Sequence, residues 1–519
     1  MGPFNNYCSK RKRFSGICFA CMFALFVCAA GCGGLAGNLT SVTPPSPTPN
    51  LTSTDVMALV QAAAQAADPT TMVIAVVDRA GNILAVYRKP AAPTLATGNF
   101  GLQVDTNELA VSLARTAAFF SNDQAPLSSR TVRFLSGIHF PPGVSGASNA
   151  ALYGIENTNR GCTLSTNFIA GQSVPPARSI NGATTGLGIT TGKADLNDSD
   201  PIAVNPGGVP LFRNGSVVGG IGVAGVPGDV AEFAAYAAAT SNGFGPAPAE
   251  PGVVIIGGVA LPFVNQTARP AGVGAGTFTG SFVVGPVASP GPPPEGMLVA
   301  PVAGPIGGLS ASDVTQIINN AILTANATRA VIRLPIGSSA RMAIAVTDLD
   351  GAIIGLYRMA DGTVFSIDVA ASKARNMVYF NSAARTAADL TEVPLGTAVT
   401  NRTIGFGAQP LYPPGIDGSA SGPFFNLYQQ DVANPCTQGF QVAGPNQSGI
   451  VFFPGSVPLY RNGMLVGGLG ISGDGVDQDD YVAAGGAAGF DAPTAIRADQ
   501  VIVRGVRLPY LKFPQNPTN

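Results

Sequence analysis

The sequence predicts an α+β protein built from two copies of one domain, each with a central antiparallel sheet and flanking helices. Residues 209–225, VPLFRNGSVVGGIGVAG, return at residues 457–473 as VPLYRNGMLVGGLGISG. In each copy two β-prone runs flank an Asn-Gly pair, which is typical of a two-residue hairpin turn. Strands joined by such a turn are antiparallel. Several flanking segments have helical spacing, and their repetition in the same order indicates a duplicated domain.

The first copy opens with a predicted helix over residues 52–67, for which Ser53 or Thr54 can serve as the N-cap. A hairpin is predicted at residues 72–88, where two apolar runs flank a turn that contains Asp, Gly and Asn. A second helix is predicted over residues 107–120, because its apolar residues recur on one side. These segments supply a sheet and a helix to cover it.

The rest of the first copy is less regular. Residues 122–206 show little periodicity, and a loop of this length is often functional or an interaction surface. The glycine-rich hairpin follows, and after it we predict a helix over residues 229–240 and a closing apolar strand over residues 253–264. Residues 265–308 are rich in Gly and Pro and are interpreted as an interdomain linker, although Phe282-Val283-Val284 could add a short strand.

The second copy repeats the same order with different loop lengths. Three pairs of segments match: 72–88 with 342–358, 112–115 with 372–375, and 258–263 with 505–510. We therefore predict one domain at residues 52–264 and a second at residues 309–513.

Composition restricts the function. The chain has 519 residues, 46% of them hydrophobic and only 11% charged, and its formal net charge is −1. A nucleic-acid-binding protein would need a basic face, so we expect no nucleic-acid partner. A single histidine excludes a multi-histidine metal site. We find no Ser/His/Asp set and no phosphate-binding loop, and strands flank the Gly-rich run on both sides, which argues against a dinucleotide site.

The N-terminus resembles a bacterial export signal. A basic run, Lys10-Arg11-Lys12-Arg13, precedes an apolar stretch that ends Ala29-Ala30-Gly31-Cys32. This ending resembles the lipobox of bacterial lipoproteins, which implies cleavage before Cys32 and its lipidation. An ordinary cleaved signal or an uncleaved anchor are the alternatives. We predict a signal at residues 1–32 and a disordered tether at residues 33–51. The expected location is a bacterial cell envelope, lipid-anchored at the outer membrane or cell surface, or else the periplasm or the medium.

The repeated motifs resemble those of the GlcG/HbpS family of haem-binding proteins, also called the haem-degrading domain. That family combines an Asp/Gly/Arg hairpin, a helix containing K-A-x-T-A, and a G-G-rich hairpin. The first copy matches at Asp78, Gly81, Arg88, Ala114 to Ala117 and Gly219 to Gly222; the second matches at Asp348, Gly351, Arg358, Lys373, Ala374 and Gly467 to Gly473. The resemblance implies a profilin-like or PAS-like fold, haem as the cofactor and possible self-association.

The resemblance also implies a set of ligand-binding residues. Thr116 occupies the position that the family associates with haem contact, although a helical threonine can instead bond to its own helix. Arg115, Lys373 and Arg375 could pair with propionates or another carboxylate, but we favour their interpretation as solvated charges on a helix face. The chain departs from the motif where Leu113 replaces its Lys and Asn376 replaces its Thr.

Function is therefore expected to be the binding of haem or a similar small molecule by an exported protein, and a binding protein is favoured over an enzyme. Two alternatives stay open at this point. One is an enzyme of small hydroxy-acid or diol metabolism, with which some relatives are associated. The other is a surface scaffold without a ligand.

Other polar residues are interpreted as structural. His139 is the only imidazole available to haem iron, but we expect a loop histidine without a metal role. Asp78 and Asp348 are expected to hold turns. Four acidic residues resemble a loose calcium loop but lack the EF-hand spacing, so we expect one of them to cap a helix: Asp474, Asp477, Asp479 and Asp480.

Two cysteines remain after the five in the first 32 residues, and they fall in corresponding long loops of the two copies. Leftover cysteines of an exported protein tend to pair. We therefore predict a Cys162–Cys436 disulfide that links the two halves.

Overall fold

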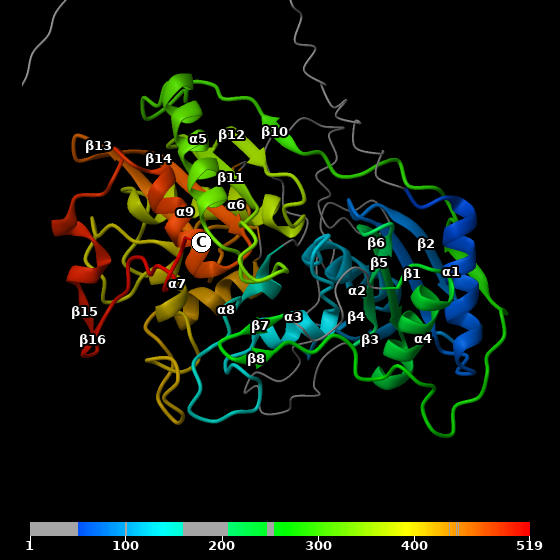
Figure 1. Cartoon of the computed structure of the whole chain (residues 1–519). Helices are drawn as coiled ribbons and strands as arrows, with labels where there is room; N and C mark the ends of the chain where they lie inside the picture. Colours follow the sequence, from blue (N-terminus) through cyan, green and yellow to red (C-terminus); the bar gives the residue numbers. More distant parts are fainter. Residues whose placement is uncertain are drawn as a thin grey trace, which may run out of the picture. The chain divides into compact units, whose positions relative to one another are not determined.

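The computed structural model describes residues 50–98, 101–158, 206–245, 254–434, 436–442, 444 and 446–518 (Figure 1). We call the described residues up to 291 half 1 and those from 292 half 2. The predicted signal, nearly all of the predicted tether and Cys162 lie outside the described residues.

Half 1 contains one five-stranded sheet in the order β5-β6-β1-β2-β9, and every neighbouring pair is antiparallel. Its helices and main strands are α1 (Ser53–Ala66), β1 (Val73–Asp78), β2 (Ile83–Arg88), α2 (Thr106–Phe120), α3 (Ser129–Ser136), β5 (Gly208–Arg213), β6 (Ser216–Ala224), α4 (Gly228–Ser241) and β9 (Ser281–Val284). Two small hairpins lie outside this sheet: β3 (Leu95–Thr97) with β4 (Gln103–Asp105), and β7 (Ile255–Ile256) with β8 (Val259–Ala260).

Half 2 repeats this topology in the order β13-β14-β11-β12-β10. Its helices and main strands are β10 (Gly296–Val299), α5 (Ala311–Ala327), β11 (Met342–Thr347), β12 (Ile353–Arg358), α6 (Phe365–Asn381), α7 (Asn401–Gly407), α8 (Phe425–Ala433), β13 (Ser456–Arg461), β14 (Met464–Gly473) and α9 (Val476–Gly486). A small hairpin, β15 (Ile502–Val503) with β16 (Val506–Arg507), corresponds to β7–β8. The predicted α+β class and the duplication are confirmed.

Several local predictions need correction. The predicted linker contributes an edge strand to each sheet: β9 had been suggested by Phe282 to Val284, whereas β10 was not predicted. The predicted closing strand at residues 253–264 is wrong, because its described part forms the separate β7–β8 hairpin. The N-cap of α1 is Thr52, which forms a capping box with Asp55. The long loop of half 1 contains the short helix α3, announced by a capping box between Ser128 and Thr131 that the sequence interpretation missed.

The glycines of the repeated hairpin let a helix pack directly on the sheet. A Cβ atom on Gly220 would lie 2.2 Å from the Ala114 carbonyl oxygen, and one on Gly470 would lie 2.0 Å from the Ala370 carbonyl oxygen. The turn itself needs left-handed backbone, and Asn214 and Asn462 both have φ of 51°. The hairpin is therefore first a packing element in both halves.

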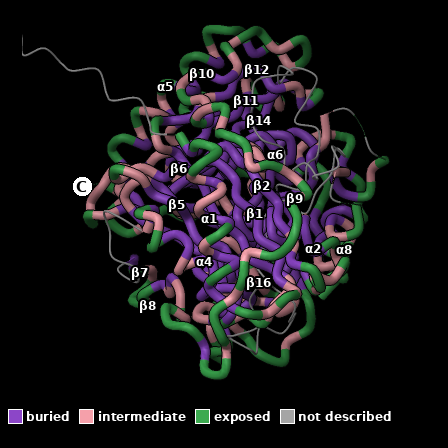
Figure 2. The backbone as a smooth tube through the Cα atoms, turned by 90° about the vertical axis from the view of Figure 1, so that its right-hand side faces the viewer, coloured by how far each residue is buried: buried purple, intermediate pink, exposed green. Residues whose placement is uncertain are grey.

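Each sheet is covered on both faces, and its central strands are buried (Figure 2). In half 1, α1 and α4 pack on one face and α2 on the other. In half 2, α5 and α9 take the place of α1 and α4, and α6 takes the place of α2. The residues on the α2 and α6 faces belong to one continuous hydrophobic cluster that both halves share.

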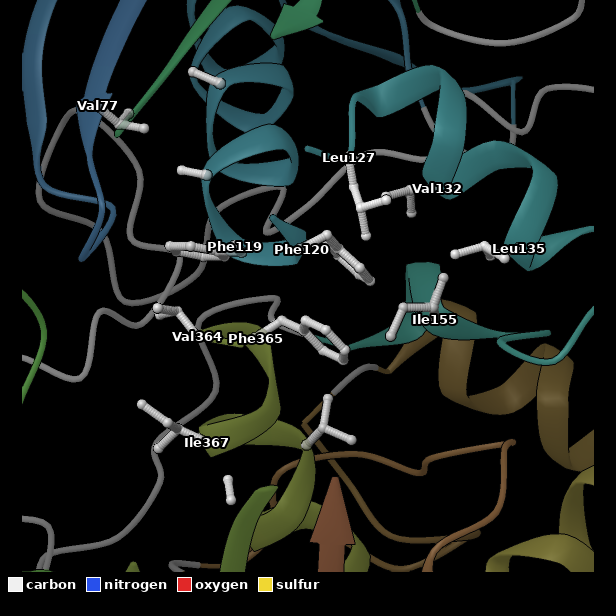
Figure 3. Close-up of a cluster of buried hydrophobic side chains, with 14 of the residues drawn as sticks. Val77, Phe119, Phe120, Leu127, Val132, Leu135, Ile155, Val364, Phe365 and Ile367 are labelled. Carbon is white, nitrogen blue, oxygen red and sulfur yellow. The ribbon is translucent and has the colours of Figure 1, made fainter. Parts of the chain in front are cut away.

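The two core helices meet through ends that do not correspond. Phe120, the last residue of α2, stacks on Phe365, the first residue of α6, with ring centroids 4.0 Å apart (Figure 3). The backbone amide of Val364 donates to the Phe119 carbonyl at 3.1 Å. The C-terminal end of one helix therefore docks on the N-terminal end of the other.

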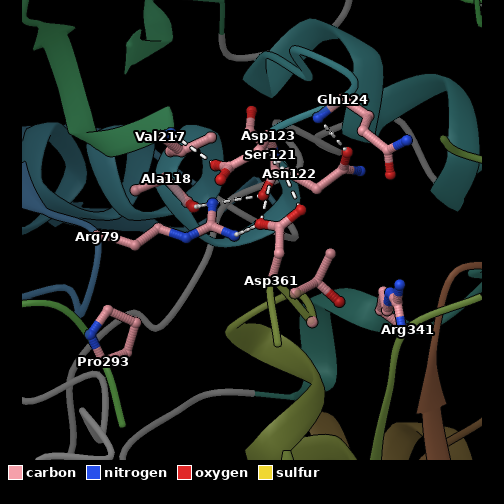
Figure 4. A network of polar contacts seen from close by, with 12 residues as sticks. Arg79, Ala118, Ser121, Asn122, Asp123, Gln124, Val217, Pro293, Arg341 and Asp361 are labelled. Carbon is pink, nitrogen blue, oxygen red and sulfur yellow. Dashed lines mark hydrogen bonds and ion pairs between the residues drawn. The ribbon is translucent and has the colours of Figure 1, made fainter. Parts of the chain in front are cut away.

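A polar network surrounds this contact. The Asp361 carboxylate of half 2 accepts from the Arg333 guanidinium at 2.6 Å. It also accepts from the Asp123 backbone amide of half 1 at 3.1 Å (Figure 4). The Arg79 guanidinium of half 1 donates to the Ala118 carbonyl at 2.8 Å and lies 3.5 Å from the Asp361 carboxylate. The halves are thus joined by charge-assisted bonds as well as by apolar packing.

Candidate functional site

Arg115 and Arg375 are buried in equivalent places and fix equivalent turns. The Nε atom of Arg115 donates to the Gly81 carbonyl at 3.0 Å, and that of Arg375 donates to the Gly351 carbonyl at 3.1 Å. Burial lowers the pKa of each guanidinium to about 10, so both remain charged at neutral pH. The interpretation of these arginines as solvated helix-face charges is wrong, because both side chains lie inside the protein.

Lys373 is also buried, and the same correction applies to it. Its ammonium donates to the Ile471 carbonyl at 2.7 Å and to the Asp479 carboxylate at 3.0 Å. Burial lowers the pKa of Lys373 and raises that of Asp479 to about 7, against the opposing pull of the ion pair. At the equivalent positions half 1 has Leu113 and Ala231. Half 2 therefore holds a buried ion pair where half 1 holds a buried apolar pair.

Thr116 is fully buried, and its hydroxyl donates to the Ser112 carbonyl of the same helix at 2.8 Å. In half 2 the equivalent Asn376 bonds to the loop in front of β13, donating to the Gly449 carbonyl and accepting from the Val451 amide, both at 2.9 Å. Haem contact at Thr116, Arg115, Lys373 and Arg375 stays a prediction. The structure does not bring these four residues together, since two belong to each half.

The four clustered aspartates of half 2 form ion pairs, and none caps a helix. The N-cap of α9 is Gly475, without a side-chain cap, so the N-cap prediction is wrong. Each carboxylate instead meets a cation: Asp474 with Arg333, Asp477 with Arg402 and Lys512, Asp479 with Lys373, and Asp480 with Arg402. The signal available in the sequence was the excess of acidic residues, but their basic partners lie far away along the chain.

The remaining polar candidates have structural partners. Asp78 accepts from the Asn82 amide at 2.9 Å and Asp348 from the Ala352 amide at 3.0 Å, so both hold turns as predicted. His139 Nε2 lies 2.8 Å from the Asp417 carboxylate. Cys436 is disulfide-bonded. Because every other cysteine lies outside the described residues, its pairing with Cys162 stays a prediction.

An apolar cleft, which no sequence motif announced, opens between the two halves. It consists of two adjoining pockets of about 430 Å³ and 280 Å³. Five residues line both pockets: Leu135, Ala151, Ile256, Val476 and Asp477. One pocket ends at the stacked pair Phe120–Phe365, and the other is lined by Phe140, Phe406 and Phe452. We call the two pockets together the interdomain cleft, and their volumes suit a small-molecule site.

Charged groups lie where the cleft meets solvent. Lys512 keeps 67% of its side chain exposed and pairs with the Asp477 carboxylate at 3.0 Å. Arg402 pairs with the same carboxylate at 2.5 Å, and Arg329 lines the smaller pocket. Three cations and one carboxylate therefore border an otherwise apolar cavity. This arrangement suits a ligand with an apolar body and acidic substituents.

The comparison with protein families gives the clearest identification. The family model described as haem-degrading protein HbpS-like matches residues 51–240 and again residues 309–488. The chain belongs to this family. The two matches fall one in each half, so this HbpS-like protein is a tandem of two family domains, as the resemblance predicted. No curated protein matches the chain.

Three solved structures are similar to about a third of the chain. The PduOC–haem complex has 24% identity and a TM-score of 0.24, and covers 36% of this chain and 97% of that chain. Klebsiella pneumoniae ORFY has 18% identity and a TM-score of 0.23, covering 35% and 90%. A double mutant of Streptomyces reticuli HbpS has 18% identity and a TM-score of 0.20, covering 34% and 83%. At these TM-scores the likenesses carry no argument, and the assignment rests on the family model.

Two features are absent from the described residues. These residues contain no group of three or more His, Cys, Asp or Glu side chains that could hold a metal ion. Within the same residues, none of the helices combines the length and the apolarity needed to cross a membrane.

Proposed function

We propose that this HbpS-like protein binds a flat apolar molecule with carboxylate substituents in the interdomain cleft, and that haem is the first candidate because of the family. The observation that carries the proposal is the cleft itself, an apolar cavity bordered by Arg329, Arg402 and Lys512. The apolar body would lie against Leu135 and Ile256, and its carboxylates would reach the cations at the opening. The proposal does not require that Thr116 contacts the haem.

The lining of the cleft suits the porphyrin ring of haem better than it suits coordination of the haem iron. Among the described residues that line it, none is a His, Cys, Met or Tyr, the side chains that usually ligate haem iron. The nearby His139 is engaged with Asp417. The protein's own residues would therefore hold the ring and its carboxylates and would not coordinate the metal. Haem, when bound, would supply the redox chemistry of its iron.

Titration of haem into the full-length protein, followed by the change of the Soret band, tests the proposal. The informative variant is Ala151→Trp, because Ala151 lines both pockets and an indole there would fill the cleft. We expect the wild type to bind at micromolar haem and Ala151→Trp to bind at least about tenfold more weakly, a loss of about 1.4 kcal/mol.

The matched control is Ala91→Trp, because Ala91 is exposed and lines neither pocket. It should bind haem like the wild type. Lys512→Ala should weaken binding by a few-fold only, because an exposed ion pair contributes about 0–1 kcal/mol. Equal affinities of the wild type and Ala151→Trp would place the ligand elsewhere, and absence of binding by the wild type would refute the function.

We further propose that the protein is exported and lipid-anchored at Cys32. The support is the basic run, the apolar stretch and the Ala30-Gly31-Cys32 ending, together with the disulfide at Cys436, which suits an oxidising compartment. Mass spectrometry of the mature N-terminus should find a lipidated Cys32, and a Cys32→Ser variant should lose membrane association. An unprocessed Met1 in the mature protein would contradict the proposal.

A further inference from the structure

A segment near the C-terminus crosses the boundary between the two pockets of the interdomain cleft. Lys512 lines the larger pocket, whereas Pro514 and Gln515 line the smaller one. We call residues 512–518 the strap. The strap lies outside both segments that match the family model, so the family does not account for it. A flat molecule that occupies both pockets would lie against the strap where the pockets join.

The chain is firmly held just before the strap. Leu508 and Tyr510 are buried. The Pro509 carbonyl accepts from the Thr403 hydroxyl at 2.6 Å, and the Tyr510 carbonyl accepts from the hydroxyl of Thr400, the N-cap of α7. These contacts fix the point at which the strap leaves the core of half 2.

The strap itself is held at the surface of the protein. The Arg329 guanidinium donates to the Gln515 carbonyl at 3.4 Å and to the Asn516 carbonyl at 3.1 Å. The Arg329 backbone amide donates to the Pro517 carbonyl at 2.9 Å. Every residue of the strap is exposed or half-buried. A segment with exposed hydrogen bonds and little apolar burial opens locally at a low free-energy cost.

Two side-chain contacts complete the attachment of the strap. Lys512 Nζ lies 3.0 Å from the Asp477 carboxylate at the opening of the cleft, and an exposed ion pair of this kind adds little stability. The Phe513 ring packs edge-on against Tyr481 of α9, with ring centroids 5.3 Å apart, and is still 48% exposed. The attached strap therefore keeps the Lys512 ammonium at the cleft without burying it.

We propose that the strap is a gate, which detaches to admit a ligand into the cleft and closes over the bound ligand. The proposal rests on the ligand-binding function proposed for the cleft. Opening breaks the bonds from Arg329 and the pair between Lys512 and Asp477, while the buried Tyr510 stays in place. Closing returns the Lys512 ammonium to the opening, where it faces a carboxylate of the ligand.

A disulfide between the strap and the segment after α5 tests the proposal by locking the gate. Thr328 and Thr518 oppose each other in an antiparallel bridge, in which Cα atoms lie about 4.5–5.5 Å apart, a distance that a disulfide spans. Neither residue lines the cleft. In stopped-flow mixing with haem, oxidised Thr328→Cys/Thr518→Cys should bind and release haem at least about tenfold more slowly than the wild type. Its affinity should stay within about threefold, because both rates fall together.

The matched control is Thr328→Cys/Thr518→Ser, which carries the same buried change and cannot form the link. It should bind haem at the wild-type rate, and peptide mapping should find the new disulfide in the locked protein alone. Hydrogen exchange of the ligand-free proteins follows the gate without haem. The amides of residues 512–518 should exchange at least about tenfold faster in the control than in the locked protein.

The outcomes separate the gate from the proposed function. Equal haem association rates in the locked and control proteins, at normal affinity, would overturn the gate and leave the binding function intact. Equal hydrogen exchange of the strap in both proteins would also overturn the gate, because the strap would then not open. Absence of haem binding by the wild type would refute the proposed function and the gate with it.

A looser strap should have the opposite effect on the association rate. Phe513→Ala removes the contact with Tyr481, and the stability of an edge-on aromatic pair corresponds to about a two- to tenfold change in the open population. Haem association should accelerate by a factor in this range. Phe440→Ala removes a phenylalanine of similar exposure outside the strap and the cleft lining and should keep the wild-type rate. No acceleration in Phe513→Ala would contradict the gate.

Discussion

Replacing Lys373 by leucine and Asp479 by alanine, singly and together, tests how the two halves tolerate different residues at one buried position. The double variant gives half 2 the Leu113 and Ala231 arrangement of half 1. Wild-type Lys373 is 0% exposed and Asp479 is 2% exposed, with 3.0 Å between the ammonium and the carboxylate. The experiment therefore exchanges a fully desolvated ion pair for an apolar pair whose packing the same protein already demonstrates.

The magnitudes follow from the burial and the distance. At 3.0 Å and an effective dielectric constant of about 20, the attraction between the two charges is about 5 kcal/mol. Removing two ions from water costs several kcal/mol for each ion, so the pair contributes little net stability. Either single variant leaves one buried charge without its partner and should lose about 3–5 kcal/mol of unfolding free energy. The double variant should lie within about 1–2 kcal/mol of the wild type.

Denaturant unfolding of the wild type, the two single variants and the double variant measures the coupling energy, which should be at least about 2 kcal/mol. Haem affinity should stay unchanged in the double variant, because neither residue lines the cleft. A single variant as stable as the wild type, or a double variant no more stable than the weaker single one, would refute the reasoning.

Three further predictions concern charge, packing and the contact between the halves. The pKa of Asp479 is raised above its unfolded value to about 7, so the stability that Asp479 contributes is complete below pH ~4 and is lost as the pH rises towards 7. Over this window the unfolding free energy of the wild type should fall, relative to that of Asp479→Asn, by at most about 1.4 kcal/mol per pH unit. A rise in the relative unfolding free energy would contradict the raised pKa. Gly220→Ala should lose about 1–3 kcal/mol, because its Cβ would lie 2.2 Å from a carbonyl oxygen, whereas Gly245→Ala, with its nearest contact at 3.3 Å, should unfold like the wild type in the same denaturant titration. Asp361→Ala should lose about 2–3 kcal/mol of unfolding free energy, because Arg333 and Arg79 lose a partner. Limited proteolysis should then cut between the halves more readily. Unchanged cleavage would show that the polar network does not hold the halves together.

The repeated elements could be predicted because their signals are local. The hairpins follow from Asn-Gly turns between apolar runs, and the core helices from the spacing of their apolar residues. The role of the paired glycines also follows, since a helix packed on the sheet leaves no space for a side chain at Gly220 or Gly470. Duplication strengthened each of these predictions, because the same pattern occurs twice.

Burial of charge could not be predicted, because it depends on partners far away in the sequence. Lys373 of α6 pairs with Asp479 of α9. Arg333 pairs with Asp361, in the turn after β12, and with Asp474, which directly follows β14. Nothing near Lys373 in the sequence distinguishes a buried lysine from a solvated one. The family motif located the right helix but did not reveal what its charges contact.

The sequence did not predict the cleft, for a similar reason. The cleft combines residues from α3, β7, α9 and the C-terminal segment, and each contributes only one or two apolar side chains.

Comparison of haem with metal-free protoporphyrin is the most direct test of the central claim, that the cleft holds a ring and its carboxylates without coordinating a metal. Quenching of porphyrin fluorescence and displacement of one compound by the other would give both affinities on the same protein. We predict affinities within about threefold of each other, and an equal loss of at least about tenfold for both in Ala151→Trp. Binding of haem without binding of the metal-free ring would contradict the claim, because the iron would then supply the affinity.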